Sequence, residues 1–129
     1  MITAPVHANP SMGAAEFDAY TRGKTFYYGS SGAPYGAEEY LDNKRVQWSF
    51  LDGKCKRGEW YAQDDLICFV YDDEQAGTTV GPDCWSFEIT DNGMTARFED
   101  GSGNQNPTEL YEVEQSDEPM MCLGPEVGV

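Results

Sequence analysis

Four cysteines have the clearest chemistry in this chain of 129 residues: Cys55, Cys68, Cys84 and Cys122. Cysteines at such spacings either form disulfides or hold a metal ion. Structural zinc sites usually contain cysteines two residues apart, whereas twelve residues separate the closest pair here, Cys55 and Cys68. We therefore predict no metal site and two disulfides, which are typical of a small secreted domain.

The pairing of these cysteines is open, because four cysteines allow three connectivities. Cys68 and Cys84 lie on consecutive predicted strands on either side of a polar loop, which favours them as neighbours. That disulfide would leave Cys55 to pair with Cys122 and tie the acidic C-terminal segment to the sheet.

Catalytic chemistry has little support in the sequence. His7 is the only histidine and lies in an N-terminal segment without periodicity, so nothing would hold it beside a serine or cysteine nucleophile. The acids Asp64 and Asp65 belong to a turn, and Glu59 and Glu88 alternate with apolar residues on strands, where carboxylates are solvated. We predict a protein without catalytic residues or a cofactor.

A calcium loop is the other metal chemistry to consider. Residues 100–106 place oxygen-bearing side chains at alternate positions, as the first half of an EF-hand loop does. The glycine expected at the sixth position and the acid expected at the twelfth are both missing. The segment is better interpreted as a polar hairpin loop.

Aromatic side chains are the best candidates for binding. They would either fill the core or line a pocket in which a few polar groups orient a ligand. An inward-facing arginine at position 97 would receive a small anion, because a buried guanidinium needs a partner. The candidate ligand-binding residues are Trp48, Trp60, Trp85, Tyr28, Arg57 and Arg97.

The elements that must position these residues are mostly strands. Residues 1–12 have no periodicity and form a tail, and residues 13–129 form one domain whose first element is a short helix ending near Gly23. Apolar alternation predicts seven strands, whereas Gly36–Asn43 is predicted to form a helical turn or a loop and Asp72–Pro82 a long polar loop. The predicted strands are Thr25–Tyr28, Lys44–Phe50, Cys55–Ala62, Leu66–Tyr71, Cys84–Thr90, Met94–Phe98 and Glu109–Val113.

Short strands separated by turns about ten residues apart favour an all-β fold. We predict an antiparallel meander barrel of six to eight strands with a short N-terminal helix; a β-sandwich is the alternative. A closed barrel leaves no exposed strand edges, which this aromatic sequence could not present safely.

Four segments resemble one family. Val46–Phe50, Gly58–Tyr61, Ile67–Tyr71 and Cys84–Phe87 are similar to the strands of small secreted, uncharacterised lipocalin-like or streptavidin-like barrel domains of alphaproteobacteria. The resemblance covers about residues 44–113. It implies a barrel and a disulfide between Cys68 and Cys84, and it assigns no activity.

The charge of the chain restricts its partners. A net charge of -15 disfavours nucleic acid and anionic membranes, and no stretch has the length of a membrane helix. Val6-His7-Ala8 resembles the end of a signal peptide, which with the cysteines predicts a periplasmic or extracellular protein. We expect a non-enzymatic binding protein for a small molecule. The alternative is an acidic inhibitor of a basic protein, such as a cell-wall lytic enzyme, with Ser31–Tyr35 resembling an inhibitory loop.

Overall fold

A computed structural model describes residues 11–30, 33–91, 93–99 and 108–122 of the chain. These residues form one α-helix, a short 3-10 helix at Asp42–Lys44 and eight strands. The α-helix, α1, comprises Ala14–Thr21. The strands are β1 Thr25–Gly29, β2 Pro34–Tyr40, β3 Arg45–Ser49, β4 Lys56–Gln63, β5 Leu66–Asp73, β6 Thr78–Thr90, β7 Gly93–Phe98 and β8 Glu109–Ser116.

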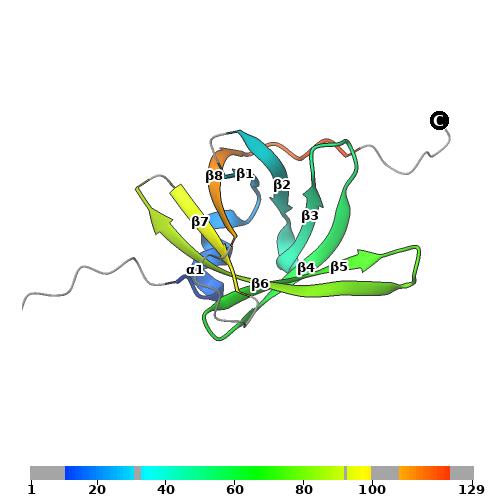
Figure 1. Ribbon diagram of the computed structural model, residues 1–129, viewed down its shortest axis with the longest axis horizontal. Coiled ribbons are helices and arrows are strands. Elements are labelled where there is room, and N and C mark those ends of the chain that lie inside the picture. The colour runs from blue at the N-terminus through cyan, green and yellow to red at the C-terminus, as the bar shows by residue number, and fades with distance from the viewer. Residues whose placement is uncertain (1–10, 31–32, 92, 100–107, 123–129) are drawn as a thin grey trace, which may run out of the picture.

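The strands close into an antiparallel barrel in which each strand pairs with its neighbours in the chain and β8 pairs with β1. Figure 1 shows this ring and the hairpin of β5 and β6, which extends beyond it. The prediction of an all-β meander barrel is confirmed, and the sandwich alternative is not adopted. Side chains alternate between the interior and the outer wall, as on β4, where Gly58 and Trp60 are buried and Arg57, Glu59 and Tyr61 are exposed.

Two segments that were not predicted as strands consist mostly of strand, although Asp42 and Asn43 do belong to a short 3-10 helix. Most of Gly36–Asn43 belongs to β2, which pairs with β1 and β3. Most of Asp72–Pro82 belongs to the long hairpin, in which Asp72 pairs with Thr79 and Asp73 with Thr78. Neither segment alternates apolar and polar residues, so pairing with neighbouring strands, rather than a local pattern, makes them strands.

The helix closes one end of the barrel. Phe17 of α1 is fully buried, and its ring contacts Tyr40, Trp60, Phe69 and Phe87, with centroid distances of 4.6 to 6.4 Å. These four rings come from β2, β4, β5 and β6. An isolated helix of eight residues is marginal, so the burial of Phe17 is what holds α1 in place.

Two disulfides fix the wall of the barrel. Cys68 pairs with Cys84 between β5 and β6, and Cys55 pairs with Cys122. The second disulfide holds the segment after β8 against the outer wall, where the Met120 amide donates to Glu39 Oε1 at 3.3 Å. The pairing favoured from the spacing of the cysteines is therefore the one that the structure contains.

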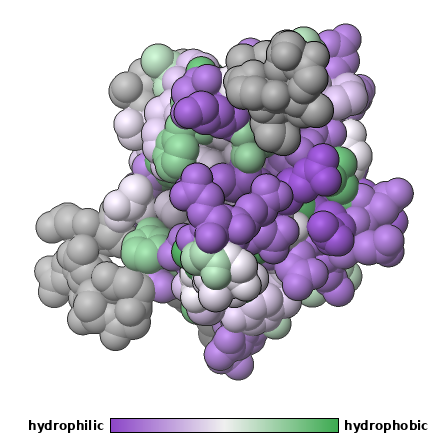
Figure 2. All heavy atoms as spheres, turned by 90° about the vertical axis from the view of Figure 1, so that its right-hand side faces the viewer, coloured by the Kyte–Doolittle hydropathy of each residue, from purple (hydrophilic) through white to green (hydrophobic). Residues whose placement is uncertain are grey.

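The outer surface differs from the interior. Figure 2 shows one face on which hydrophilic residues predominate and hydrophobic residues are scattered. No helix in the described ranges is long and apolar enough to cross a membrane. Residues 1–10 of the predicted tail, the calcium-like loop and Ser31 and Gly32 lie outside the described residues. Met12, the last residue of the predicted tail, is instead buried in the core, and its amide donates to the Phe87 carbonyl oxygen at 2.7 Å.

Candidate functional site

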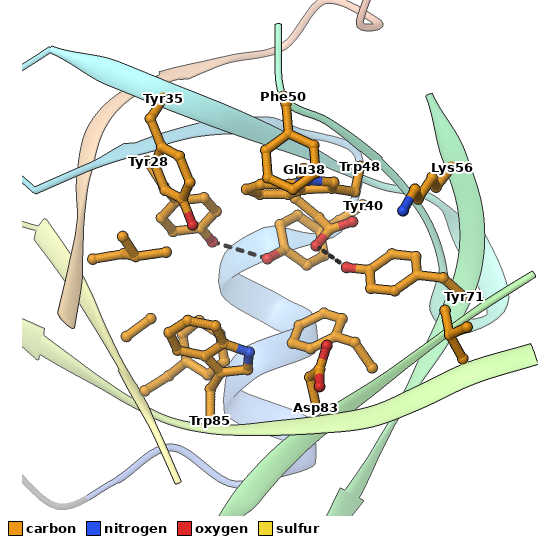
Figure 3. A pocket seen from close by; sticks show the side chains of 15 residues that line it. Tyr28, Tyr35, Glu38, Tyr40, Trp48, Phe50, Lys56, Tyr71, Asp83 and Trp85 are labelled. Atoms are coloured by element: carbon orange, nitrogen blue, oxygen red, sulfur yellow. Dashed lines mark hydrogen bonds between the residues drawn. The ribbon is translucent and has the colours of Figure 1, made fainter. Parts of the chain in front are cut away.

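The half of the barrel opposite α1 is not filled by side chains. It contains a cavity of about 240 Å³, which we call the cup. Figure 3 looks into the cup, with α1 behind the side chains that line it. Its rim includes the exposed side chains of Tyr35, Phe50 and Val80. Its floor includes Tyr40, Phe69 and Phe87, which are buried and contact Phe17 of the helix.

Glycines shape the wall of the cup. A Cβ atom on Gly36 would lie 2.3 Å from the indole ring of Trp48, so only glycine lets this ring lie against β2. A Cβ atom on Gly58 would lie 2.9 Å from Cδ1 of the Tyr71 ring and 2.2 Å from the Val70 carbonyl oxygen. Both glycines make room for an aromatic ring of a neighbouring strand.

One acid, Glu38 of β2, lies among these rings. Its side chain is 4% exposed and lines the cup between Gly36 and Tyr40, the inward-facing neighbours on its strand. Glu38 Oε1 accepts a hydrogen bond of 2.7 Å from the Tyr71 hydroxyl. Glu38 Oε2 is buried and has no hydrogen-bond partner among the described residues. Buried polar atoms are normally paired, so this oxygen is an exception that calls for an explanation.

Burial raises the pKa of the Glu38 carboxyl well above its ordinary value, although the hydrogen bond from Tyr71 acts in the opposite direction. The cause is desolvation, which disfavours the charged form of a carboxyl in an apolar site. Without a ligand, the carboxyl therefore keeps its proton to a higher pH than an exposed glutamate does.

Tyrosine hydroxyls form the rest of the polar lining. Tyr28 and Tyr40 share a hydrogen bond of 2.8 Å, drawn in Figure 3 beside the bond between Tyr71 and Glu38. Burial raises the pKa of Tyr28, Tyr40 and Tyr71 well above the ordinary tyrosine value. The hydroxyls are consequently neutral near pH 7 and act as hydrogen-bonding groups.

The structure brings three of the six predicted ligand-binding residues to the cup. Tyr28, Trp48 and Trp85 line it. Trp60 lies elsewhere, buried at the closed end with its ring centroid 5.0 Å from that of Phe17.

The two predicted arginines, Arg57 and Arg97, lie on the outer wall. Arg57 is exposed because the inward positions of β4 are those of Gly58 and Trp60. Arg97 is exposed between the buried Ala96 and the half-buried Phe98, and its Nη2 is 2.6 Å from Glu109 Oε2. Arg97 therefore does not face the barrel interior, and the anion site predicted for an inward-facing Arg97 is not formed.

Sequence reasoning missed the most polar part of the cup. Glu38 was missed because its segment was not predicted to be a strand. A strand from Pro34 to Tyr40 would have placed Gly36, Glu38 and Tyr40 on one face, which is the signal that could have found it. Tyr35, in the segment that resembles an inhibitory loop, lies at the rim, with its ring centroid 6.0 Å from that of Trp48.

Metal binding has no candidate site in the described ranges, where no three His, Cys, Asp or Glu side chains are grouped as metal ligands. The cup can instead surround an apolar body with aromatic rings and offer it a carboxyl group and hydroxyls. No family model matches the chain, and no curated protein or solved structure matches it at a significant level.

Proposed function

We propose that this protein is an extracytoplasmic, non-enzymatic binding protein that takes up a small, largely apolar ligand in the cup. The observation that carries the proposal is the cavity of about 240 Å³ in the half of the barrel that α1 leaves unfilled. A closed barrel of eight strands is wide enough either to be filled by its own side chains or to hold one small ligand.

The size and lining of the cup indicate the ligand. An apolar cavity of about 150 Å³ holds a benzene molecule, so the cup has room for one or two rings with a short substituent. Its walls are mainly aromatic, with a carboxyl and hydroxyls at a few places, which is the usual composition of a site for a small organic molecule.

The disulfides support the proposed compartment. Cys55–Cys122 and Cys68–Cys84 use all four cysteines of the chain. Disulfides persist in oxidising compartments and are rare in the cytosol, which supports a periplasmic or extracellular location.

Filling the cup tests the proposal. Ala96 lines the cup and is 2% exposed, so Ala96→Phe would place a phenyl ring inside it. Ala62→Phe makes the same change at an exposed position of β4 and is the matched control. We expect the neutral fluorophore N-phenyl-1-naphthylamine to bind the natural protein and the control, and to bind Ala96→Phe at least about tenfold more weakly.

Tryptophan emission gives a second measure of the same binding. Trp48 and Trp85 line the cup, so Trp48→Phe and Trp85→Phe should each reduce the change in emission that the fluorophore causes. Equal binding by Ala96→Phe, once circular dichroism has shown that it is folded, would overturn the proposal. Association with a basic protein would instead weaken with salt and would not depend on position 96.

A further inference from the structure

We propose that the ligand of the cup is a small organic cation, a primary amine on an aromatic or short aliphatic body, whose ammonium group pairs with the Glu38 carboxylate. This inference rests on the proposed function, since it names the chemical class of the ligand that the cup would bind. The geometry of Glu38, the charge of the cup and its aromatic walls support it independently of one another.

The position of Glu38 is the first support. Its carboxyl group lies among the lining side chains in Figure 3, and the side chain is more than nine-tenths buried. Tyr71 occupies Oε1 and leaves Oε2 without a partner among the described residues. The terminal torsion of a glutamate side chain is broad, so a small rotation would present Oε2 to a ligand in the cup. A ligand with an N–H group would supply the missing partner.

Charge is the second support. A buried carboxylate is stable only when a positive group is paired with it, and no ion pair joins Glu38 to any described lysine or arginine. Lys56, the one described base that lines the cup, is exposed, and Asp83 is a second acid in the lining. Once Glu38 is ionised, the lining has two acids against this one base, and the whole chain has a net charge of -15. Both favour a cation over an anion.

The walls are the third support. Trp48, Trp85 and the tyrosines present ring faces and edges to the cup, and the face of an aromatic ring attracts a cation. Tryptophan gives the strongest attraction of this kind, and the strength increases when water is excluded. An ammonium group at Glu38 would thus lie within an aromatic enclosure, while the organic body of the ligand contacts the remaining rings.

Binding of an amine should release the proton of the Glu38 carboxyl group. Burial holds the free Glu38 carboxyl in its protonated form to raised pH. An ammonium ion, R–NH₃⁺, binds Glu38–COOH and forms the pair of carboxylate and ammonium, and the proton of the carboxyl group leaves to water. Binding of the amine should therefore strengthen as pH rises toward the pKa of free Glu38, whereas binding of a neutral analogue should not change.

The tyrosines around Glu38 do not account for such a pH dependence. The tyrosines have raised pKa values because they are buried or bonded to a carboxylate, and that of Tyr20 is raised to about 12. Glu112 accepts hydrogen bonds from Tyr20 and from the Met94 amide. Besides Glu38, the ionisable groups that line the cup are Tyr28 of β1, Tyr35 and Tyr40 of β2, Lys56 of β4, Tyr71 of β5 and Asp83 of β6, and Tyr20 of α1 and Glu112 of β8 interact with Tyr28.

Isothermal titration calorimetry with three probes of one shape tests the proposal: 2-phenylethylamine, the neutral 2-phenylethanol and the anionic phenylacetate. A hydrogen-bonded charge pair that the alcohol lacks should make the amine bind about 10- to 100-fold more tightly, with phenylacetate weakest. Glu38→Gln should abolish the preference for the amine and leave binding of the alcohol nearly unchanged. Glutamine keeps an oxygen for Tyr71 but removes the charge.

Glu39→Gln is the matched control. Glu39 is the next residue of β2, and its side chain points to the outer wall, where it accepts hydrogen bonds from Gln47 and from the Met120 amide. The substitution removes the same charge from the same strand without touching the cup. It should keep the preference for the amine, which would separate pairing at Glu38 from general attraction to an acidic protein.

Proton release gives a readout that needs no variant. Calorimetry at about pH 6 in buffers of different ionisation enthalpy should show up to one proton released for each bound amine and none for the alcohol. Equal affinity for the amine and the alcohol, or unchanged binding of the amine by Glu38→Gln, would overturn this inference alone. The proposed function fails instead if the natural protein binds neither the neutral fluorophore nor any of the three probes.

Discussion

The two ends of the barrel are built from the same kinds of residue and serve different purposes. At the closed end, Phe17 of α1 enters the barrel and packs against rings from four strands, including Trp60. At the open end, Trp48 and Trp85 belong to the wall of a cavity. Whether a tryptophan of this barrel belongs to the core or to the cavity wall therefore depends on how far α1 extends into the barrel.

The two ends also differ in their buried polar groups. Phe17 is surrounded by rings, and the Tyr40 hydroxyl points away from it toward Tyr28. The open end contains the Glu38 carboxyl, one oxygen of which has no partner among the described residues. Dense packing at the closed end contributes stability, whereas a buried oxygen without a hydrogen bond at the open end lowers it.

Phe17→Ala should cause the largest change in stability, because it removes the ring that fills the closed end. A buried phenylalanine truncated to alanine typically lowers the free energy of unfolding by about 3–5 kcal/mol. Urea denaturation followed by circular dichroism would measure this loss. Phe50→Ala is the matched control at the rim, where the side chain is 54% exposed and the expected loss is below about 1 kcal/mol. Similar losses at the two positions would contradict the distinction between the ends.

Glu38→Gln should change how stability depends on pH. The pKa of Glu38 is raised in the folded protein above the ordinary value of 4.5, so the folded state binds more protons than the unfolded state above that pH. The stabilising effect of the bound proton is complete below about pH 4.5 and is lost as pH rises toward the folded pKa, by up to about 1.4 kcal/mol per pH unit.

Glu38→Gln has no carboxyl group at this position, so its free energy of unfolding does not show this loss. Its stability relative to the natural protein should therefore increase from pH 4.5 upward until the folded pKa of Glu38 is reached. Urea titrations at several pH values between about 4 and 8 would measure the difference. Glu39→Gln controls for net charge. A difference between natural protein and Glu38→Gln that stays constant with pH would show that Glu38 is not held protonated in the folded state.

The sequence was sufficient to predict the barrel because most strands alternate clearly. Val46 and Trp48 on β3 and Phe87 on β6 face the interior as expected. The order of the strands favoured Cys84 as the disulfide partner of Cys68, although the sequence alone left three pairings open. The limits of β2 could not be read in this way, since Ala37 and Glu38 are both buried and two acids are adjacent. The inward-facing residues of β2 become buried only because the other strands close the barrel around them.

The sequence indicated that aromatic residues could line a pocket, but it did not indicate which polar groups the pocket would contain. Aromatic residues indicated a core or a pocket, and the choice depended on how far α1 extends into the barrel. Arg97 looked like a candidate anion ligand, yet it lies next to the buried Ala96 on an alternating strand and pairs with Glu109 on the neighbouring β8. Glu38 lies in a segment that was not predicted to be a strand, and a sequence does not show which carboxyl groups lose water when distant strands meet.

Tyr28→Phe should have the smallest effect of the three substitutions and tests whether the hydroxyls of the open end form a paired network. It removes one partner of the 2.8 Å bond and leaves the Tyr40 hydroxyl buried and unpaired, which should lower the free energy of unfolding by about 1 kcal/mol. Tyr111→Phe is the control, because its hydroxyl bonds to Glu109 on the exposed outer wall and water can replace it. Urea denaturation of both variants would measure the difference. If Tyr28→Phe were as neutral as the control, water inside the cup would be satisfying the Tyr40 hydroxyl, and the open end would be wetter than its aromatic walls indicate.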